Sequence, residues 1–139
     1  MKGVLFLCVE NHARSQMAEG LARHFLGHQQ DIYSAGSKPS ARVHPMAIAV
    51  MAEIGIDILG QHPKPLNSID LSKIQLIVTL CSKEECPALP SHIRHEHWPI
   101  SDPSYSAQEQ TNEQIRKFRK VRDNLRQRVL ELRAADQVW

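Results

Sequence analysis

The segment from Cys8 to Ser15 contains the residues best suited to chemistry in this chain. It reads Cys-Val-Glu-Asn-His-Ala-Arg-Ser, so a cysteine is followed, after five other residues, by the pair Arg14-Ser15. An apolar run precedes it and a helical pattern begins near Ser15, which predicts a loop between a buried strand and a helix. Amides in such a loop and in the first turn of a helix lack backbone partners and can surround an oxyanion. The expected anion-binding residues are Cys8, Val9, Glu10, Asn11, His12, Ala13, Arg14 and Ser15.

Two of these side chains have predicted chemical roles. The planar guanidinium of Arg14 can hold two oxygens of a tetrahedral anion. The same positive field favours the thiolate form of Cys8, which is the nucleophilic form of a cysteine. Asn11 tolerates a left-handed backbone and can brace the turn with its amide. The alternative is a cysteine that only packs in the core, but the Arg14-Ser15 pair at this spacing favours a nucleophile that faces an oxyanion.

Length and composition bound the remaining possibilities. The chain has 139 residues, of which 42% are hydrophobic and 23% charged, so we expect one compact domain over residues 1–139. No apolar run is long enough to cross a bilayer and no signal-peptide pattern is visible, which predicts a cytoplasmic protein without a membrane partner. Three cysteines in a reducing compartment argue against a structural disulfide framework and for thiol chemistry or metal binding.

Hydrophobic periodicity predicts alternating strands and helices. Helical spacing or helix boundaries occur over residues 15–26, 45–55 and 115–132, and strand patterns over residues 4–7, 32–33, 75–80 and, as an edge strand, 94–98. This order predicts an α/β fold with a parallel sheet, right-handed crossovers and helices on both faces. The last helix is strongly basic, yet its apolar residues recur at helical spacing, so we interpret the charges as a solvated face and expect no nucleic-acid partner.

Two cysteines are expected to meet at the sheet edge. Cys8 and Cys81 each follow a buried strand, and parallel strands expose their carboxyl ends at the same edge. If the strands are neighbours, their backbones lie about 5 Å apart, which suits a disulfide. The alternative is that Cys81 is a core thiol. His95 and His97 share a strand face and could chelate a metal, but no third ligand has a clear spacing.

Several motifs in order resemble the low-molecular-weight tyrosine phosphatase superfamily, and most closely its arsenate reductase branch. They are the loop with the following Ser15-Gln16-Met17-Ala18-Glu19-Gly20, then Ser34-Ala35-Gly36, Val43-His44-Pro45-Met46-Ala47-Ile48, Gly55-Ile56-Asp57-Ile58, Val78-Thr79-Leu80-Cys81 and Asp102-Pro103. The similarity spans essentially the whole chain. It implies a three-layer sandwich with a central four-stranded parallel sheet and helices on both faces.

The resemblance also implies a reaction. Cys8 attacks arsenate held by the loop and Arg14, and Asp102 is the general acid. Cys81 then attacks the Cys8 sulfur and releases arsenite, and Cys86 attacks Cys81 to leave a disulfide that thioredoxin reduces. Two thiols that become a disulfide supply the two electrons, so the resemblance implies no tightly bound cofactor. We expect a monomer whose partners are arsenate and thioredoxin.

The resemblance further implies a potassium ion near Asn11, Glu19 and Ser34, although His62-Pro63-Lys64 stands where relatives offer hydroxyl and carboxylate ligands. Two other functions remain open. A phosphatase would use the same nucleophile, arginine and acid, but would not need Cys81 and Cys86. A noncatalytic module could bind an oxyanion or sense oxidation through the same thiols. For Asp102 the alternative is a turn starter before proline.

Overall fold

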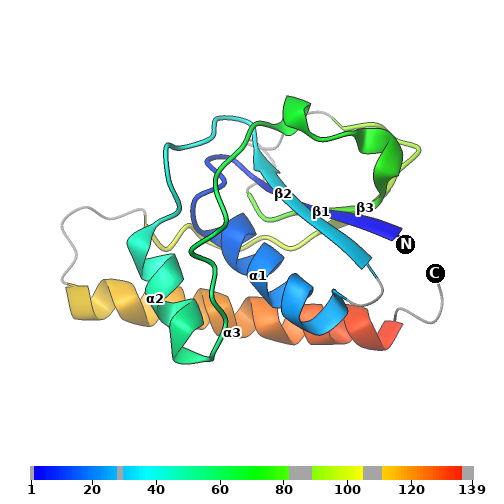
Figure 1. Cartoon of the computed structure of the whole chain (residues 1–139). Helices are drawn as coiled ribbons and strands as arrows, with labels where there is room; N and C mark the ends of the chain where they lie inside the picture. Colours follow the sequence, from blue (N-terminus) through cyan, green and yellow to red (C-terminus); the bar gives the residue numbers. More distant parts are fainter. Residues whose placement is uncertain (1, 28–29, 82–88, 105–110, 136–139) are drawn as a thin grey trace.

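The computed structural model describes residues 2–27, 30–81, 89–104 and 111–135. Its sheet consists of strands β1 (Lys2–Cys8), β2 (Gln30–Gly36), β3 (Ile74–Thr79) and β4 (Arg94–His97), as Figure 1 shows for the first three. All pairings are parallel and the strand order is β2-β1-β3-β4. The predicted parallel sheet of four strands is therefore confirmed. Its edge strand at residues 94–98 is also confirmed, with the strand ending at His97.

The three α-helices lie on one face of this sheet. They are α1 (Arg14–Leu26), α2 (Pro45–Glu53) and α3 (Thr111–Ala135), and Figure 1 shows them below the strands. Phe6 and Val78 from the sheet pack in the same core as Met17 of α1 and Phe118 of α3, and all four are fully buried. This core explains the apolar residues on one face of β1, which are Val4, Phe6 and Cys8.

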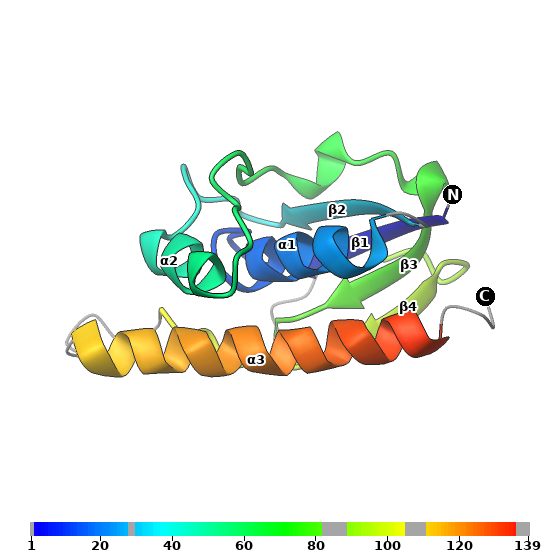
Figure 2. The ribbon, with the colours of Figure 1, turned by 60° about the horizontal axis from the view of Figure 1, so that its bottom comes forward.

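Two short 3-10 helices cover the opposite face. They are η1 (Leu66–Ser68) and η2 (Leu71–Lys73), drawn above the sheet in Figure 2. Leu66, Ile69 and Leu71 pack there against a smaller core that includes Leu5 and Ile77. In the described part of the chain, the prediction of helices on both faces is thus met by α-helices on one side and by 3-10 helices on the other.

The boundaries of α2 follow the expected signals. Pro45 occupies its first turn, and the Nδ1 of His44 accepts a hydrogen bond from the Met46 amide at 3.1 Å. Gly55 follows the helix with a φ of +79°, a left-handed conformation that suits glycine. In α3, residues such as Phe118 and Leu125 are buried and Arg116 and Arg126 are exposed, as predicted.

Two of the basic residues of α3 form hydrogen bonds with α2. Arg119 donates to both carboxylate oxygens of Glu53, and Arg122 donates to Glu53 and to the carbonyl of Val50. These bonds join α3 to the end of α2. The interpretation of the charges as a solvated face therefore holds at Arg119, whose side chain is 43% exposed, and is wrong at Arg122, which is buried and binds α2.

The sheet register brings two strand ends together. Leu7 pairs with Thr79, and the amide of Leu80 donates to the Leu7 carbonyl at 2.9 Å. The carboxyl ends of β1 and β3 therefore lie side by side, which confirms the expected neighbourhood of the strands that precede Cys8 and Cys81. No helix within the described residues is long and apolar enough to cross a membrane.

Candidate active site

Cys8 is the last residue of β1 and is almost fully buried as a free thiol. Its sulfur lies 2.8 Å from the hydroxyl oxygen of Ser15. That oxygen accepts a hydrogen bond from the Asn11 side-chain amide at 2.7 Å, so its own proton remains available to Cys8. A hydroxyl that donates to sulfur stabilises the thiolate over the thiol, because the charged acceptor forms the stronger hydrogen bond.

The loop of residues 9–13 turns its carbonyl groups outward. Those of Val9, Glu10 and His12 accept hydrogen bonds from the amides of Lys38, Ser40 and His44, at 2.7 to 2.9 Å. Within the part of the chain that the structure describes, none of the backbone N–H groups of residues 10–14 donates to a protein acceptor. Donors without partners are what an oxyanion requires, so the predicted anion-binding loop has the expected polarity.

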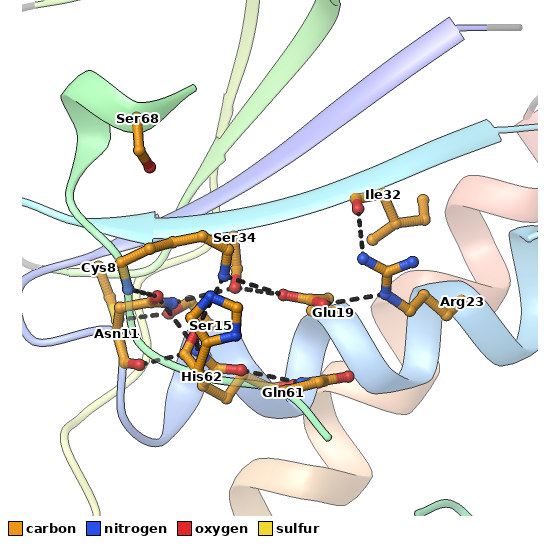
Figure 3. A network of polar contacts seen from close by, with 12 residues as sticks. Cys8, Asn11, Ser15, Glu19, Arg23, Ile32, Ser34, Gln61, His62 and Ser68 are labelled. Atoms are coloured by element: carbon orange, nitrogen blue, oxygen red, sulfur yellow. Dashed lines mark hydrogen bonds and ion pairs between the residues drawn. The ribbon is translucent and has the colours of Figure 1, made fainter. Parts of the chain in front are cut away.

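Asn11 holds this loop in shape. Its φ is +51°, a left-handed conformation of the kind that asparagine was expected to tolerate, and its side chain is completely buried. The side-chain amide donates to Ser15 and to Ser34, and its oxygen accepts from the Lys64 amide and from Gln16, at 2.7 to 3.1 Å. Figure 3 shows the side chain of Asn11 in the middle of these contacts.

Gln16 and Gln61 extend the network in a way the sequence did not predict. The Gln16 amide donates to the Asn11 carbonyl and to the His62 carbonyl, both at 3.0 Å, and Gln61 donates to the Gln16 carbonyl and side-chain oxygen at 2.9 Å. These bonds fasten the segment around His62 to the loop (Figure 3). No periodic pattern in the sequence points to this pairing, because the two glutamines lie 45 positions apart.

The end of β2 lies close to the backbone of the anion-binding loop. Gly36 at the end of β2 lies against the loop, and a Cβ on it would come within 2.5 Å of the Val9 carbonyl oxygen and 3.0 Å of Asn11. Only glycine allows this contact without displacing the loop. Ala13, buried at the N-cap of α1, accepts a hydrogen bond from the Met17 amide at 2.9 Å through its carbonyl.

Arg14 connects the loop to two distant segments. Its Nη1 donates to the carbonyls of Leu80 at 3.3 Å and Ile100 at 2.9 Å, and its Nη2 lies 3.9 Å from Oδ2 of Asp102. The side chain is only 8% exposed. Arg14 is thus held next to both the end of β3 and the predicted acid, which confirms that these residues lie together.

Asp102 starts a turn and also faces the site. Its Oδ1 accepts hydrogen bonds from the Ser104 amide at 2.9 Å and hydroxyl at 2.6 Å, an arrangement that Asp70 and Ser72 repeat far from the site. Burial acts to raise the pKa of Asp102, but the Ser104 hydrogen bonds and the charges of Arg14 and His12 together hold it below its usual value. Asp102 is therefore a carboxylate at neutral pH, with Oδ2 directed to Arg14.

Cys81 is completely buried one residue after Leu80, at a bend. Cys8 and Leu80 belong to the same core, on one side of the sheet. Cys81 follows the end of β3 by two residues and is disulfide-bonded in this structure, whereas Cys8 is a free thiol. Cys86 lies outside the described residues.

The expected potassium ligands do come together, but around a different cation. The Ser34 hydroxyl donates to Oε1 of Glu19 at 2.5 Å, and the ammonium of Lys64 lies 3.7 Å from the same oxygen. Asn11 directs its amide nitrogen, which is a donor, at Ser34. Burial is the largest influence on Lys64 and leaves its pKa below the ordinary value, although the charge of Glu19 acts in the opposite direction. A potassium ion does not fit this set of groups, because Lys64 already supplies the positive charge.

The second metal hypothesis gains no support. The hydroxyl of Thr79 lies 3.1 Å from Nε2 of His95 and 2.7 Å from Nδ1 of His97, so both rings are engaged by the same hydroxyl. Among residues 2–27, 30–81, 89–104 and 111–135, no group of three or more His, Cys, Asp or Glu side chains is arranged to hold a metal ion.

Comparison with known proteins places this geometry in a family. The family model for low molecular weight phosphotyrosine protein phosphatase matches residues 3–137. The arsenate reductase of Bacillus subtilis is 40% identical over 132 residues, which cover 94% of each chain. A solved arsenate reductase in its phosphate-binding state is 36% identical, with a TM-score of 0.81 over 97% of this chain and 98% of that one.

A further solved structure is that of a thioredoxin-dependent arsenate reductase from Corynebacterium glutamicum. It is 27% identical, with a TM-score of 0.77 over 99% of this chain and 63% of that longer chain. These comparisons cover nearly the whole chain, including the four-stranded parallel sheet and the loop that follows β1. The chain therefore belongs to the low molecular weight phosphotyrosine protein phosphatase family, and its relatives at about 40% identity within that family are arsenate reductases.

Proposed function

We propose that this protein reduces arsenate to arsenite through Cys8 and a disulfide relay, which passes to Cys81 and Cys86 and is reset by thioredoxin. The observation that carries the proposal is the surrounding of Cys8: a sulfur beside the Ser15 hydroxyl, at the base of a loop with unpaired amides. The names of the relatives support arsenate as the substrate. The thioredoxin-dependent neighbour supports thioredoxin as the electron donor.

The first step forms a bond between sulfur and arsenic. Arsenate binds to the amides of residues 10–14, and the Cys8 thiolate attacks arsenic while one oxygen leaves as water. Asp102 donates the proton that this oxygen needs. Its pKa lies low in the anion-free site, but an oxyanion next to Oδ2 adds negative charge and favours the protonated acid. Arg14, at 3.9 Å from Oδ2, holds the anion and the acid in one place.

The second and third steps transfer two electrons. The Cys81 thiolate attacks the Cys8 sulfur, the electron pair of the sulfur–arsenic bond passes to arsenic, and arsenite leaves. Cys86 then attacks the Cys81 sulfur, releases the Cys8 thiolate and leaves a Cys81–Cys86 disulfide for a dithiol donor such as thioredoxin.

Hydrolysis of phosphate monoesters is the second candidate. It uses the same Cys8, Arg14 and Asp102, and the family model that matches the chain is that of a phosphatase. Phosphate and arsenate have nearly the same shape and charge, so the loop alone discriminates little between them. The two functions differ in whether Cys81 and Cys86 are required.

The test measures arsenite formation and p-nitrophenyl phosphate hydrolysis on the same reduced protein, with thioredoxin compared with glutaredoxin and glutathione as donors. We expect no arsenite from Cys8→Ser or Cys81→Ser. Cys86→Ser should form at most one arsenite per protein, because the Cys8–Cys81 disulfide then stays in place.

The phosphatase assay is the matched control. Any phosphatase activity should disappear in Cys8→Ser and persist in the Cys81 and Cys86 variants. Full multiple turnover by Cys86→Ser would contradict the relay. Robust hydrolysis without arsenite formation by the wild type would instead establish a phosphatase, and oxidation of the thiols without either turnover would establish a redox-sensing module.

A further inference from the structure

His12 lies between the anion-binding loop and the segment that carries Asp102, although the reaction proposed above gives it no part. Its Nε2 is 3.3 Å from the Ser104 hydroxyl oxygen and 3.1 Å from Oε2 of Glu10. The side chain is only 14% exposed. His12 therefore makes a polar connection from the loop, through Ser104, to the predicted general acid.

The directions of these hydrogen bonds follow from the protons available. The Ser104 hydroxyl has one proton and donates it to Oδ1 of Asp102 at 2.6 Å. Towards His12 the same oxygen can only accept, so Nε2 of His12 carries a proton. The Glu10 carboxylate, on the other side of Nε2, is also an acceptor, so both neighbours require the same protonated nitrogen.

The connection determines which oxygen of Asp102 is free for catalysis. Oδ1 is occupied by two hydrogen bonds from Ser104, and Oδ2 remains on the side of Arg14. We propose that His12 is a positioning residue, whose Nε2–H fixes Ser104 so that Asp102 directs Oδ2 at the anion held by Arg14. This inference rests on the proposed function, since it concerns the acid of that reaction.

The chain offers a matched comparison for this role. Asp70 and Ser72 form the same turn, with the hydroxyl at 2.6 Å and the amide at 3.1 Å from Oδ1 of Asp70. This second turn is exposed and lies at η2, away from the loop. Ser72→Ala therefore removes the same kind of hydrogen bond without touching the site, and it serves as the control for Ser104→Ala.

The experiment measures arsenite formation in a single turnover of reduced protein, together with the dissociation constant for inorganic phosphate. We expect His12→Ala and Ser104→Ala each to slow the single turnover about tenfold. Phosphate affinity should change by less than about threefold, because the loop amides are unaffected. His12→Gln, whose amide can donate from nearly the same point, should recover most of the rate. Ser72→Ala should match the wild type.

The double variant decides whether the two residues act as one unit. If His12 works through Ser104, the variant with both alanines is no slower than the slower single variant; independent effects would multiply to about a hundredfold. A wild-type rate in His12→Ala, multiplied effects, or a loss of phosphate affinity as large as the loss of rate would each overturn the inference. Absence of arsenite from the wild type would overturn the proposed function itself, and a full rate in Asp102→Asn would overturn the assignment of the acid.

Discussion

Replacement of Asn11 tests how the loop around Cys8 is held. Alanine at this position would keep the φ of +51° without the side chain that makes it tolerable, which costs about 1 kcal/mol. It would also remove four hydrogen bonds, and the Lys64 amide would lose the acceptor that it has in the Asn11 side chain. Three of the four partners keep another contact, so we assign about 2 kcal/mol to this loss. The expected destabilisation of Asn11→Ala is about 3 kcal/mol.

Asn11→Gly separates the two contributions. Glycine also lacks the four hydrogen bonds, but it adopts a positive φ without strain. We therefore expect Asn11→Gly to be about 1 kcal/mol more stable than Asn11→Ala and about 2 kcal/mol less stable than the wild type. Urea unfolding at neutral pH measures these differences, and the dissociation constant for phosphate should worsen in the same order.

Two outcomes would refute this reasoning. Equal stability of the glycine and alanine variants would mean that the left-handed backbone at position 11 is not a cost that asparagine relieves. Unfolding free energies of both variants within about 0.5 kcal/mol of the wild type would mean that the hydrogen bonds of the network contribute little, since even one net bond is worth about that much.

Two further predictions concern charged groups. The hydrogen bond from Arg119, followed by that from Arg122, lowers the pKa of Glu53 to about 2 from an ordinary value of 4.5. The thermal midpoint of Glu53→Gln should therefore lie below that of the wild type at pH 7. This difference should shrink as the pH falls from 4.5 towards 2, because the stability that a carboxyl with a lowered pKa contributes is lost when it is protonated. A difference as large at pH 2 as at pH 7 would contradict this. Because the ammonium of Lys64 lies 3.7 Å from Glu19, exchange of KCl for NaCl at constant ionic strength should leave the wild-type midpoint and activity unchanged, whereas a specific rise in KCl would show that potassium binds after all.

Local patterns were sufficient to predict most of the fold. The apolar run before Cys8 and the helical spacing after Arg14 identified the strand, loop and helix of the site, and the proline and glycine around α2 marked its ends. The second strand was predicted only at residues 32–33 but extends over Gln30–Gly36. It is an edge strand with polar residues, and these obscure the hydrophobic signal on which such predictions depend.

The supporting contacts of the site could not be predicted in the same way. Gln16 meets Gln61 across 45 positions of the chain, and Lys64 reaches Glu19 from a loop without a regular pattern. Such pairs depend on how the elements pack, and periodicity carries no information about which distant polar groups meet. Cys8, Arg14 and Ser15 were found because their spacing within one turn carries the chemistry directly.

The backbone bonds that tie residues 9–12 to residues 38–44 determine how small a ligand this enzyme can use. Fixing the backbone of a flexible loop the length of residues 9–13 would cost roughly 5 to 10 kcal/mol of conformational entropy. An inorganic anion has so few atoms that its total binding free energy is limited to about 7 kcal/mol. It could not both order such a loop and remain bound. The hydrogen bonds to residues 38–44 already order the loop before the anion binds. Nearly all of the interaction free energy therefore contributes to affinity, so that even a substrate as small as an inorganic anion can bind.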